Sequence, residues 1–99
     1  MDCLIRNAMV VDGSGRPPFP GDIAVRKDRI SQIGRIGEMN AEVTIDAAGK
    51  VVAPGFIDIH SHTDLTIFHH PLAESKVLQG VTLDVIGNCG IGPFPVDPD

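Results

Sequence analysis

The hydrophobic pattern of this chain changes at Pro54-Gly55, and this change constrains the fold more than any other feature. Before it, short runs alternate apolar and polar residues, as strands with one buried face do. After it, Phe56 to His60 is a nearly continuous apolar run with one acid, which is typical of a strand buried on both faces in a parallel sheet. The sequence therefore predicts a mixed β and α/β fold, with a small β-domain over residues 1–53 and a β-α-β unit within residues 54–99.

The first part of the chain is predicted to contain short strands joined by turns. Its punctuation by glycine and proline, of which the chain has 11 and 8, excludes long helices there. Residues 22–26 and 29–33 alternate around Lys27-Asp28 and predict a β-hairpin, whereas residues 16–21, with three prolines, predict an irregular connection. Further strands are expected at residues 4–6, 8–11, 42–46 and 51–53.

The second part is predicted to be a β-α-β unit. Its strands are expected at residues 56–60 and 81–86, parallel and joined by a helix near residues 71–79. Pro71 suits the first position of that helix and Gly80 the position after its end. Its buried stripe would consist of Leu72, Ala73, Val77 and Leu78. Two strands and one helix cannot form a stable sheet, and a complete (β/α)₈ barrel needs about 250 residues, so we expect this sequence to be the truncated beginning of a longer protein.

Composition restricts the partners of the chain. It has 8 Lys and Arg against 13 Asp and Glu, a net charge of −5, which argues against nucleic acid and against an anionic membrane surface. No apolar run approaches the ~20 residues of a membrane span, and polar residues interrupt the N-terminus, so a cytoplasmic location is expected. The two cysteines, Cys3 and Cys89, are interpreted as thiols. The oligomeric state stays open.

Two histidines at the end of the first buried strand are candidate metal ligands. His60 and His62 are two residues apart, so on an extended strand both imidazoles lie on one face, together with Asp58 as a supporting or structural acid. Two neutral imidazoles at the C-terminal end of such a strand can bind one divalent ion. The alternative is a solvated pair of histidines that water satisfies.

Cys89 is the third candidate ligand. It lies in Gly87-Asn88-Cys89-Gly90, after the second strand, so neighbouring strands would bring it to the edge of the sheet where the histidines lie. A His, His and Cys set suits zinc at a site that keeps open positions. The alternative is a thiol that packs as a small hydrophobic group. Solvated or capping roles are expected for His69 and His70, and Lys76 is expected at an exposed helix position. Asp97 and Asp99 are expected in a solvated tail, and Cys3 is expected to be a packed or edge thiol.

The run from Val52 to Asp64, together with Gln79-Gly80-Val81-Thr82 and Gly87-Asn88-Cys89-Gly90, resembles the D-aminoacylase (N-acyl-D-amino-acid deacylase) branch of the amidohydrolase superfamily. Residues 4–13, 30–34 and 45–50 share the likeness, which therefore covers nearly the whole chain. The resemblance implies a β-domain leading into a metal-bearing TIM barrel. It also implies zinc, with one tightly bound ion held by His60 and His62, Cys89 near or between two metal positions, and a second, weaker site.

The main hypothesis is a zinc-dependent hydrolase that cleaves the amide bond of N-acyl-D-amino acids. Many relatives carry Thr between the histidines and two acids after them, where this chain has Ser61 and Thr63-Asp64, so its acyl substrate stays open. The resemblance implies that the general base lies beyond residue 99, so no catalytic residue is assigned here and the chain by itself is expected to be inactive. A cyclic-amide hydrolase of the dihydroorotase or hydantoinase kind is the alternative enzyme, which Gly-Asn-Cys-Gly disfavours. The other alternative is a non-catalytic, β-rich truncated fragment.

Overall fold

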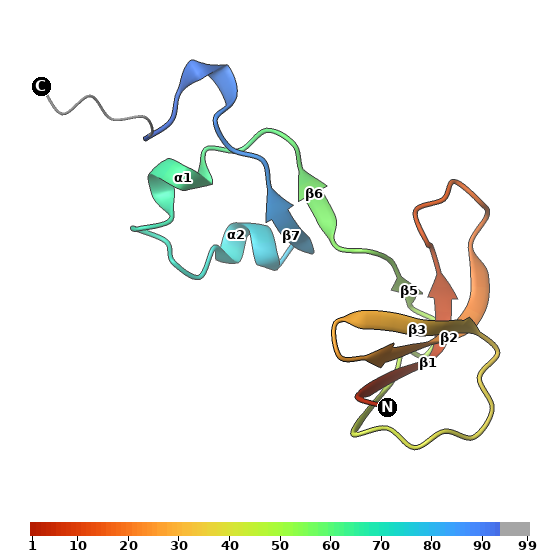
Figure 1. Cartoon of the computed structure of the whole chain (residues 1–99). Helices are drawn as coiled ribbons and strands as arrows, with labels where there is room; N and C mark the ends of the chain where they lie inside the picture. Colours follow the sequence, from red (N-terminus) through yellow and green to blue (C-terminus); the bar gives the residue numbers. More distant parts are fainter. Residues whose placement is uncertain (94–99) are drawn as a thin grey trace, which may run out of the picture. The chain divides into compact units, whose positions relative to one another are not determined.

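The computed structural model describes residues 1–93 and contains two compact units, Met1–Pro54 and Gly55–Asp99 (Figure 1). Unit 1 is a five-stranded sheet and unit 2 has a two-stranded sheet with short helices. Asp97 and Asp99, expected in a solvated tail, lie outside the described residues. The five strands of unit 1 are β1 (Cys3–Val10), β2 (Phe19–Arg26), β3 (Arg29–Gly34), β4 (Val43–Asp46) and β5 (Val51–Val52).

The sheet of unit 1 has the order β3-β2-β1-β4, and β5 also pairs with β1. The predicted hairpin is confirmed, since β2 and β3 are antiparallel and Arg26 pairs with Arg29. β1 is antiparallel to β2 and parallel to β4 and β5. Where two strands were predicted, β1 is a single strand with an irregularity: the register shifts between Ile5 and Ala8, and Asn7 adopts a φ of 56°.

The predicted irregular connection over residues 16–21 is wrong for its second half, because β2 begins at Phe19. Pro20 lies inside this strand and pairs with Met9 of β1. The pairing of β2 with β3 begins only at Asp22, so Pro20 has a neighbouring strand on one side alone. Proline lacks a backbone donor and is accepted in strands at such edge positions.

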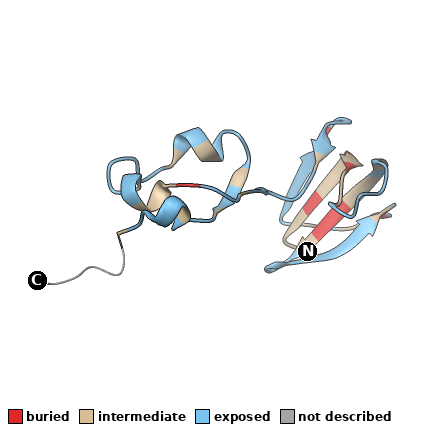
Figure 2. Ribbon diagram, turned by 90° about the horizontal axis from the view of Figure 1, so that it is seen from above, coloured by how far each residue is buried: buried red, intermediate tan, exposed pale blue. Residues whose placement is uncertain are grey.

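The core of the described residues belongs to unit 1, as Figure 2 shows by the red segments on its strands. One cluster contains Ala8, Val10, Ile23 and Ala47, and a second contains Leu4, Ala24 and Ile36. Within β1, Leu4, Ala8 and Val10 are buried, and the bulge at Asn7 lies between the first two. β1 and β2 thus supply most of the buried apolar side chains, and the adjacent Ile23 and Ala24 of β2 belong to different clusters.

Unit 2 contains β6 (Phe56–Asp58), α1 (Thr63–Thr66), α2 (Glu74–Val77), β7 (Val81–Asp84) and the 3₁₀ turn η1 (Asn88–Gly90). β6 and β7 are parallel, with Phe56 opposite Val81 and Asp58 opposite Asp84, which confirms the predicted pairing. Both strands are shorter than predicted. α2 is only the centre of the predicted helix, Pro71 lies in the turn before it, and α1 was not predicted. None of the described helices is long and apolar enough to cross a membrane.

The predicted burial of unit 2 is wrong for the described residues. Phe56 and Ile57 of β6 are 60% and 58% exposed, and the expected helix stripe is exposed too, with Leu78 at 85%. Leu72 and Val77 are likewise exposed, and Ala73 is half-buried. The physical reason is that two short strands and two single-turn helices provide no second layer to cover these side chains.

Candidate metal site

The three predicted ligands converge in unit 2. The ligand atoms of His60, His62 and Cys89 all lie within 4.8 Å of one another, and His60 Nε2 is 3.0 Å from Cys89 Sγ. The imidazole rings have centroids 5.6 Å apart and planes inclined by 68°. His60 and Cys89 are exposed and His62 is half-buried. This is the one group of three or more such donors among residues 1–93.

The route to this convergence differs from the prediction. β6 ends at Asp58, so the alternation of a strand does not carry both histidines; His60 lies in a bend and His62 immediately precedes α1. Backbone hydrogen bonds continue the pairing beyond the strands. Val85 N–H donates to Asp58 O at 2.8 Å and Ser61 N–H donates to Val85 O at 3.0 Å, which brings the ends of β6 and β7 level.

The backbone around Cys89 is folded tightly toward the histidines. Asn88 Nδ2 donates to Val85 O at 2.8 Å, which closes the turn after β7. Gly87 and Gly90 adopt positive φ, as glycine does without cost. Cys89 itself has a φ of 61°, in the left-handed region that a residue with a Cβ rarely adopts. Asn7, Lys27, Ala48 and Ala73 adopt similar φ values, so this conformation by itself does not identify a functional site.

The donor set fits a zinc ion. Tetrahedral zinc, with Zn–N near 2.0–2.1 Å and Zn–S near 2.3 Å, places its donors roughly 3.3 to 3.6 Å apart. The observed separations, from 3.0 Å up to 4.8 Å, approach this spacing closely enough for side-chain rotation to complete it. His62 Nδ1 is buried and has no hydrogen-bond partner among the described residues. Two imidazoles and a thiol favour zinc over magnesium or calcium, which prefer oxygen ligands.

Asp58 holds the backbone that carries His60. Its Oδ1 accepts the His60 N–H at 3.1 Å, and its Oδ2 forms an ion pair with Lys76 Nζ from α2. Lys76, together with the His60 N–H, keeps the pKa of the Asp58 carboxyl below its usual range. The hydrogen bond between Lys76 and Asp58 raises the pKa of the Lys76 ammonium. Asp58 therefore supports the backbone at His60, and its role as the supporting acid of a metal site stays a prediction.

Asp84, the last residue of β7, holds the segment on either side of His62. Its Oδ2 accepts hydrogen bonds from Ser61 Oγ at 3.3 Å and from Thr63 Oγ1 at 2.5 Å. Ser61 Oγ is also 2.7 Å from Thr63 Oγ1 and accepts the Thr63 N–H at 3.2 Å. Ser61 is only 4% exposed. Lys76 Nζ lies 3.8 Å from the other oxygen of Asp84.

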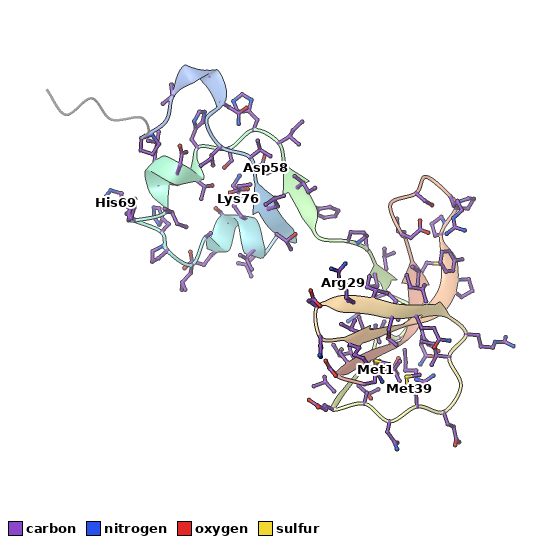
Figure 3. All side chains as sticks on the ribbon, in the orientation of Figure 1. Met1, Arg29, Met39, Asp58, His69 and Lys76 are labelled. Carbon is purple, nitrogen blue, oxygen red and sulfur yellow. The ribbon has the colours of Figure 1, made fainter. Side chains whose placement is uncertain are left out.

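The sequence did not reveal this polar network. Lys76, expected at an exposed helix position, is half-buried and reaches both carboxylates, because the single turn of α2 lies against β7; Figure 3 shows it beside Asp58. Asp84 could have been found as an acid inside the apolar run of residues 81–86. His69 and His70 are exposed, as expected, and do not belong to the three-donor group. Cys3 is a half-buried free thiol in β1.

Residues 43–96 match the model of the amidohydrolase family, so the chain belongs to that family. It is 43% identical over 95 residues to N-acyl-D-glutamate deacylase of Alcaligenes xylosoxydans xylosoxydans, a match that covers 96% of this chain and 20% of the relative. This chain also resembles the crystal structure of N-acyl-D-glutamate deacylase from Bordetella bronchiseptica, which is complexed with zinc and a phosphonate mimic of the tetrahedral intermediate. The two superpose with a TM-score of 0.87 at 43% identity, over 96% of this chain and 20% of that one. The chain thus spans about a fifth of these relatives.

L-hydantoinase from Arthrobacter aurescens is a weaker match. It superposes with a TM-score of 0.57 at 31% identity and covers 64% of this chain and 14% of that one. The likeness to the deacylases extends over more of the chain at higher identity. The cyclic-amide alternative is accordingly less favoured than the deacylase hypothesis.

Proposed function

We propose that His60, His62 and Cys89 bind zinc in a metal-dependent hydrolase that cleaves the amide bond of N-acyl-D-amino acids. The observation that carries this proposal is the convergence of three donor atoms within 4.8 Å at the ends of two parallel strands. Deacylases that resemble this chain over 96% of its length support the substrate class. The exposed position of Cys89 suits a ligand placed near or between a tight zinc site and a second, weaker one.

The residues of this chain would hold the metal and keep its ligands in place. A bound zinc ion supplies a Lewis acid for the scissile carbonyl and a bound water of lowered pKa. Asp58 and Asp84 orient the segments that carry His60 and His62. Both carboxylates are engaged by Lys76, so neither is assigned as the general base. We assign neither the general base nor the N-acyl amino acid pocket to residues of this chain.

The fold proposal is that residues 1–53 form an N-terminal β-domain and residues 54–99 begin a (β/α)₈ barrel. β6, α2 and β7 form the β-α-β order of such a barrel, and the metal donors follow the C-terminal ends of the strands, where barrels place their active sites. The exposed apolar side chains of β6, β7 and α2 are the ones that further strands and helices of a barrel would cover.

Zinc binding by the purified chain tests the metal site. We expect about one tightly bound zinc per chain, measured by competition with a chromophoric chelator, and its loss in Cys89→Ala. Cys3→Ala is the matched control, because Cys3 lies in β1 of unit 1. A Cys89→Ala variant that keeps the full zinc stoichiometry would show that Cys89 is not a ligand. Absence of zinc binding in the wild-type chain would favour the non-catalytic alternative.

A chimaera tests the reaction. Residues 1–99 would replace the matched fifth of the Alcaligenes N-acyl-D-glutamate deacylase. We expect the zinc-loaded chimaera to hydrolyse N-acyl-D-glutamate and to lose this activity with Cys89→Ala. Ring opening of a hydantoin or of dihydroorotate, without deacylation, would instead support the cyclic-amide alternative. A zinc-loaded chimaera that hydrolyses neither kind of amide would contradict both enzyme hypotheses.

A further inference from the structure

Among residues 1–93, Lys76 is the one cation that contacts both Asp58 and Asp84, the carboxylates that hold the backbone next to the candidate metal donors. Its ammonium forms an ion pair with Asp58 Oδ2 and lies 3.8 Å from Asp84 Oδ1. The side chains of Lys76, Asp58 and Asp84 are 28%, 30% and 16% exposed, so solvent screens this triad only in part. Its three members come from α2, β6 and β7, so the ammonium ties together three elements of unit 2.

Each carboxylate uses its other oxygen to hold a segment that carries a metal donor. Asp58 Oδ1 accepts the His60 N–H, and Asp84 Oδ2 accepts the hydroxyls of Ser61 and Thr63, which flank His62. The two acids thus hold His60 by its backbone, and Ser61 and Thr63 by their hydroxyl groups. Neither acid is itself a member of the three-donor group.

The ammonium also balances charge. Asp58 and Asp84 lie opposite each other in the register of β6 and β7, on adjacent parallel strands. Like charges directly opposite on neighbouring strands are destabilising. Removing the cation would leave two half-buried carboxylates facing one another, and a partly buried charge that loses its partner costs free energy. The segments that they hold would relax with them.

We propose that Lys76 is a positioning residue for zinc: by bridging Asp58 and Asp84 it fixes the backbone at His60 and around His62 in the spacing that the ion requires. This inference rests on the proposed metal site and adds a residue to it. If Lys76 were purely structural, replacing it would change only the stability of unit 2. If Lys76 positions the ligands, replacing it changes the affinity for zinc and the geometry of the bound ion.

The test measures zinc affinity and cobalt spectra on the 99-residue chain. Lys76→Met keeps the length of the side chain and removes its charge, and we expect zinc to bind ~10- to 100-fold more weakly, as metal sites show when a group supporting a ligand is lost. Lys76→Arg, which keeps the cation, should restore most of the affinity. Lys50→Met is the control, since it removes the same charge from an exposed position of unit 1.

Cobalt(II) in place of zinc supplies a readout independent of stability. In Lys76→Met we expect a weakened thiolate-to-cobalt charge-transfer band at saturating metal, because the Cys89 and histidine donors no longer share the ion in one geometry. An unchanged band and unchanged zinc affinity in a folded Lys76→Met would overturn the proposal. Should Lys76→Met fail to fold, Asp58→Asn decides, since it removes the same ion pair and leaves an oxygen for the His60 N–H.

Cys89→Ala separates this proposal from the proposed function. If Cys89→Ala loses zinc while Lys76→Met and Asp58→Asn bind it like the wild type, the metal site stands and the positioning role is wrong. If Cys89→Ala also binds zinc like the wild type, the metal site itself is wrong. Weak binding in Lys76→Met together with rescue by Lys76→Arg supports both.

Discussion

Asp22 shows how a single charged side chain holds unit 1 together. Its Oδ1 accepts the Asn7 N–H at 3.0 Å, while its Oδ2 accepts the Ile36 N–H at 3.3 Å and pairs with Arg6 Nη1 at 3.1 Å. Asn7 is the residue at which β1 bulges, so this carboxylate satisfies a backbone donor that the bulge removes from the sheet. The Asn7 N–H, with those of Ile36 and Arg6, lowers the pKa of Asp22.

Asp22→Asn is expected to destabilise unit 1 by about 1 to 3 kcal/mol at neutral pH, because it turns an amide donor toward backbone donors. The folded-state pKa lies below the unfolded value near 3.9, so the carboxylate contributes its stability above that value and loses it as the pH falls through the folded pKa. Urea unfolding followed by circular dichroism should therefore show the two proteins converging in acid. Asp28→Asn, at an exposed turn position, is the control, and parallel pH profiles would contradict the role of Asp22.

Cys89 combines a strained backbone with the side chain of a candidate metal ligand. Its φ of 61° costs a residue with a Cβ about 1 kcal/mol relative to glycine. We expect Cys89→Gly to be more stable than the metal-free wild type by roughly that amount, and Cys89→Ala to show no such gain, while both lose zinc. Thermal unfolding with and without a chelator measures this. Equal stability of the Gly and Ala variants would contradict strain at this position.

At the scale of elements, Gly55 permits the close approach of β6 and β7. A Cβ at position 55 would lie 2.2 Å from Thr82 Oγ1 and 2.7 Å from Thr82 Cβ, closer than any side-chain rotation relieves. Gly55→Ala should therefore weaken the strand pair by about 1 to 3 kcal/mol, the usual cost of overpacking. Amide exchange at Phe56 and Val85, which donate to Gly80 and Asp58, would report it.

Thr82→Ala is the companion variant, because it removes the Thr82 Oγ1 and Cγ2 that the new methyl group would strike first. We expect it to restore part of the protection in the double variant, but not all, since the Thr82 Cβ remains. Full protection in Gly55→Ala alone would show that β6 shifts without cost.

The elements that the sequence predicted are those with local causes. Alternation and the Lys27-Asp28 turn predict the hairpin of β2 and β3. The change of pattern at Pro54-Gly55 indicates β6 and its parallel pairing with β7. Pro20 in β2 was missed because a strand accepts proline only where a neighbour is absent, which depends on the register with β3. α1 was missed because a single turn is too short for a periodic pattern, and α2, also a single turn, is shorter than the helix predicted over residues 71–79.

The candidate site divides in the same way. His60, His62 and Cys89 could be proposed from residue type and from their places after two strands, although His60 lies in a bend and His62 immediately before α1. The triad of Lys76, Asp58 and Asp84 could not, because it depends on which side of α2 lies against β7. Side-chain contacts between three elements leave no spacing rule in the sequence.

For the molecule as a whole, burial is unequal between the two units. All the buried apolar residues of the described chain, from Leu4 to Ala47, belong to unit 1, whereas the buried residue of unit 2 is Ser61 (Figure 2). Since apolar burial supplies most of the stability of a fold, unit 1 should unfold at the higher denaturant concentration. Unit 2 depends instead on backbone pairing and on the Lys76 triad.

Zinc should therefore stabilise unit 2 selectively. A ligand that binds only the folded form adds RT ln(1 + [L]/Kd), about 2.7 kcal/mol at a hundred times Kd, to the unit that binds it. Hydrogen exchange on the 99-residue chain should show zinc protecting the amides of Ser61 and Val85, which join the ends of β6 and β7, while those of Met9 and Val11 in unit 1 stay unchanged. Cys89→Ala should abolish the increment. An equal rise in amide protection in both units would show that they unfold together. If zinc raised the protection of neither unit, the zinc site proposed in unit 2 would be contradicted.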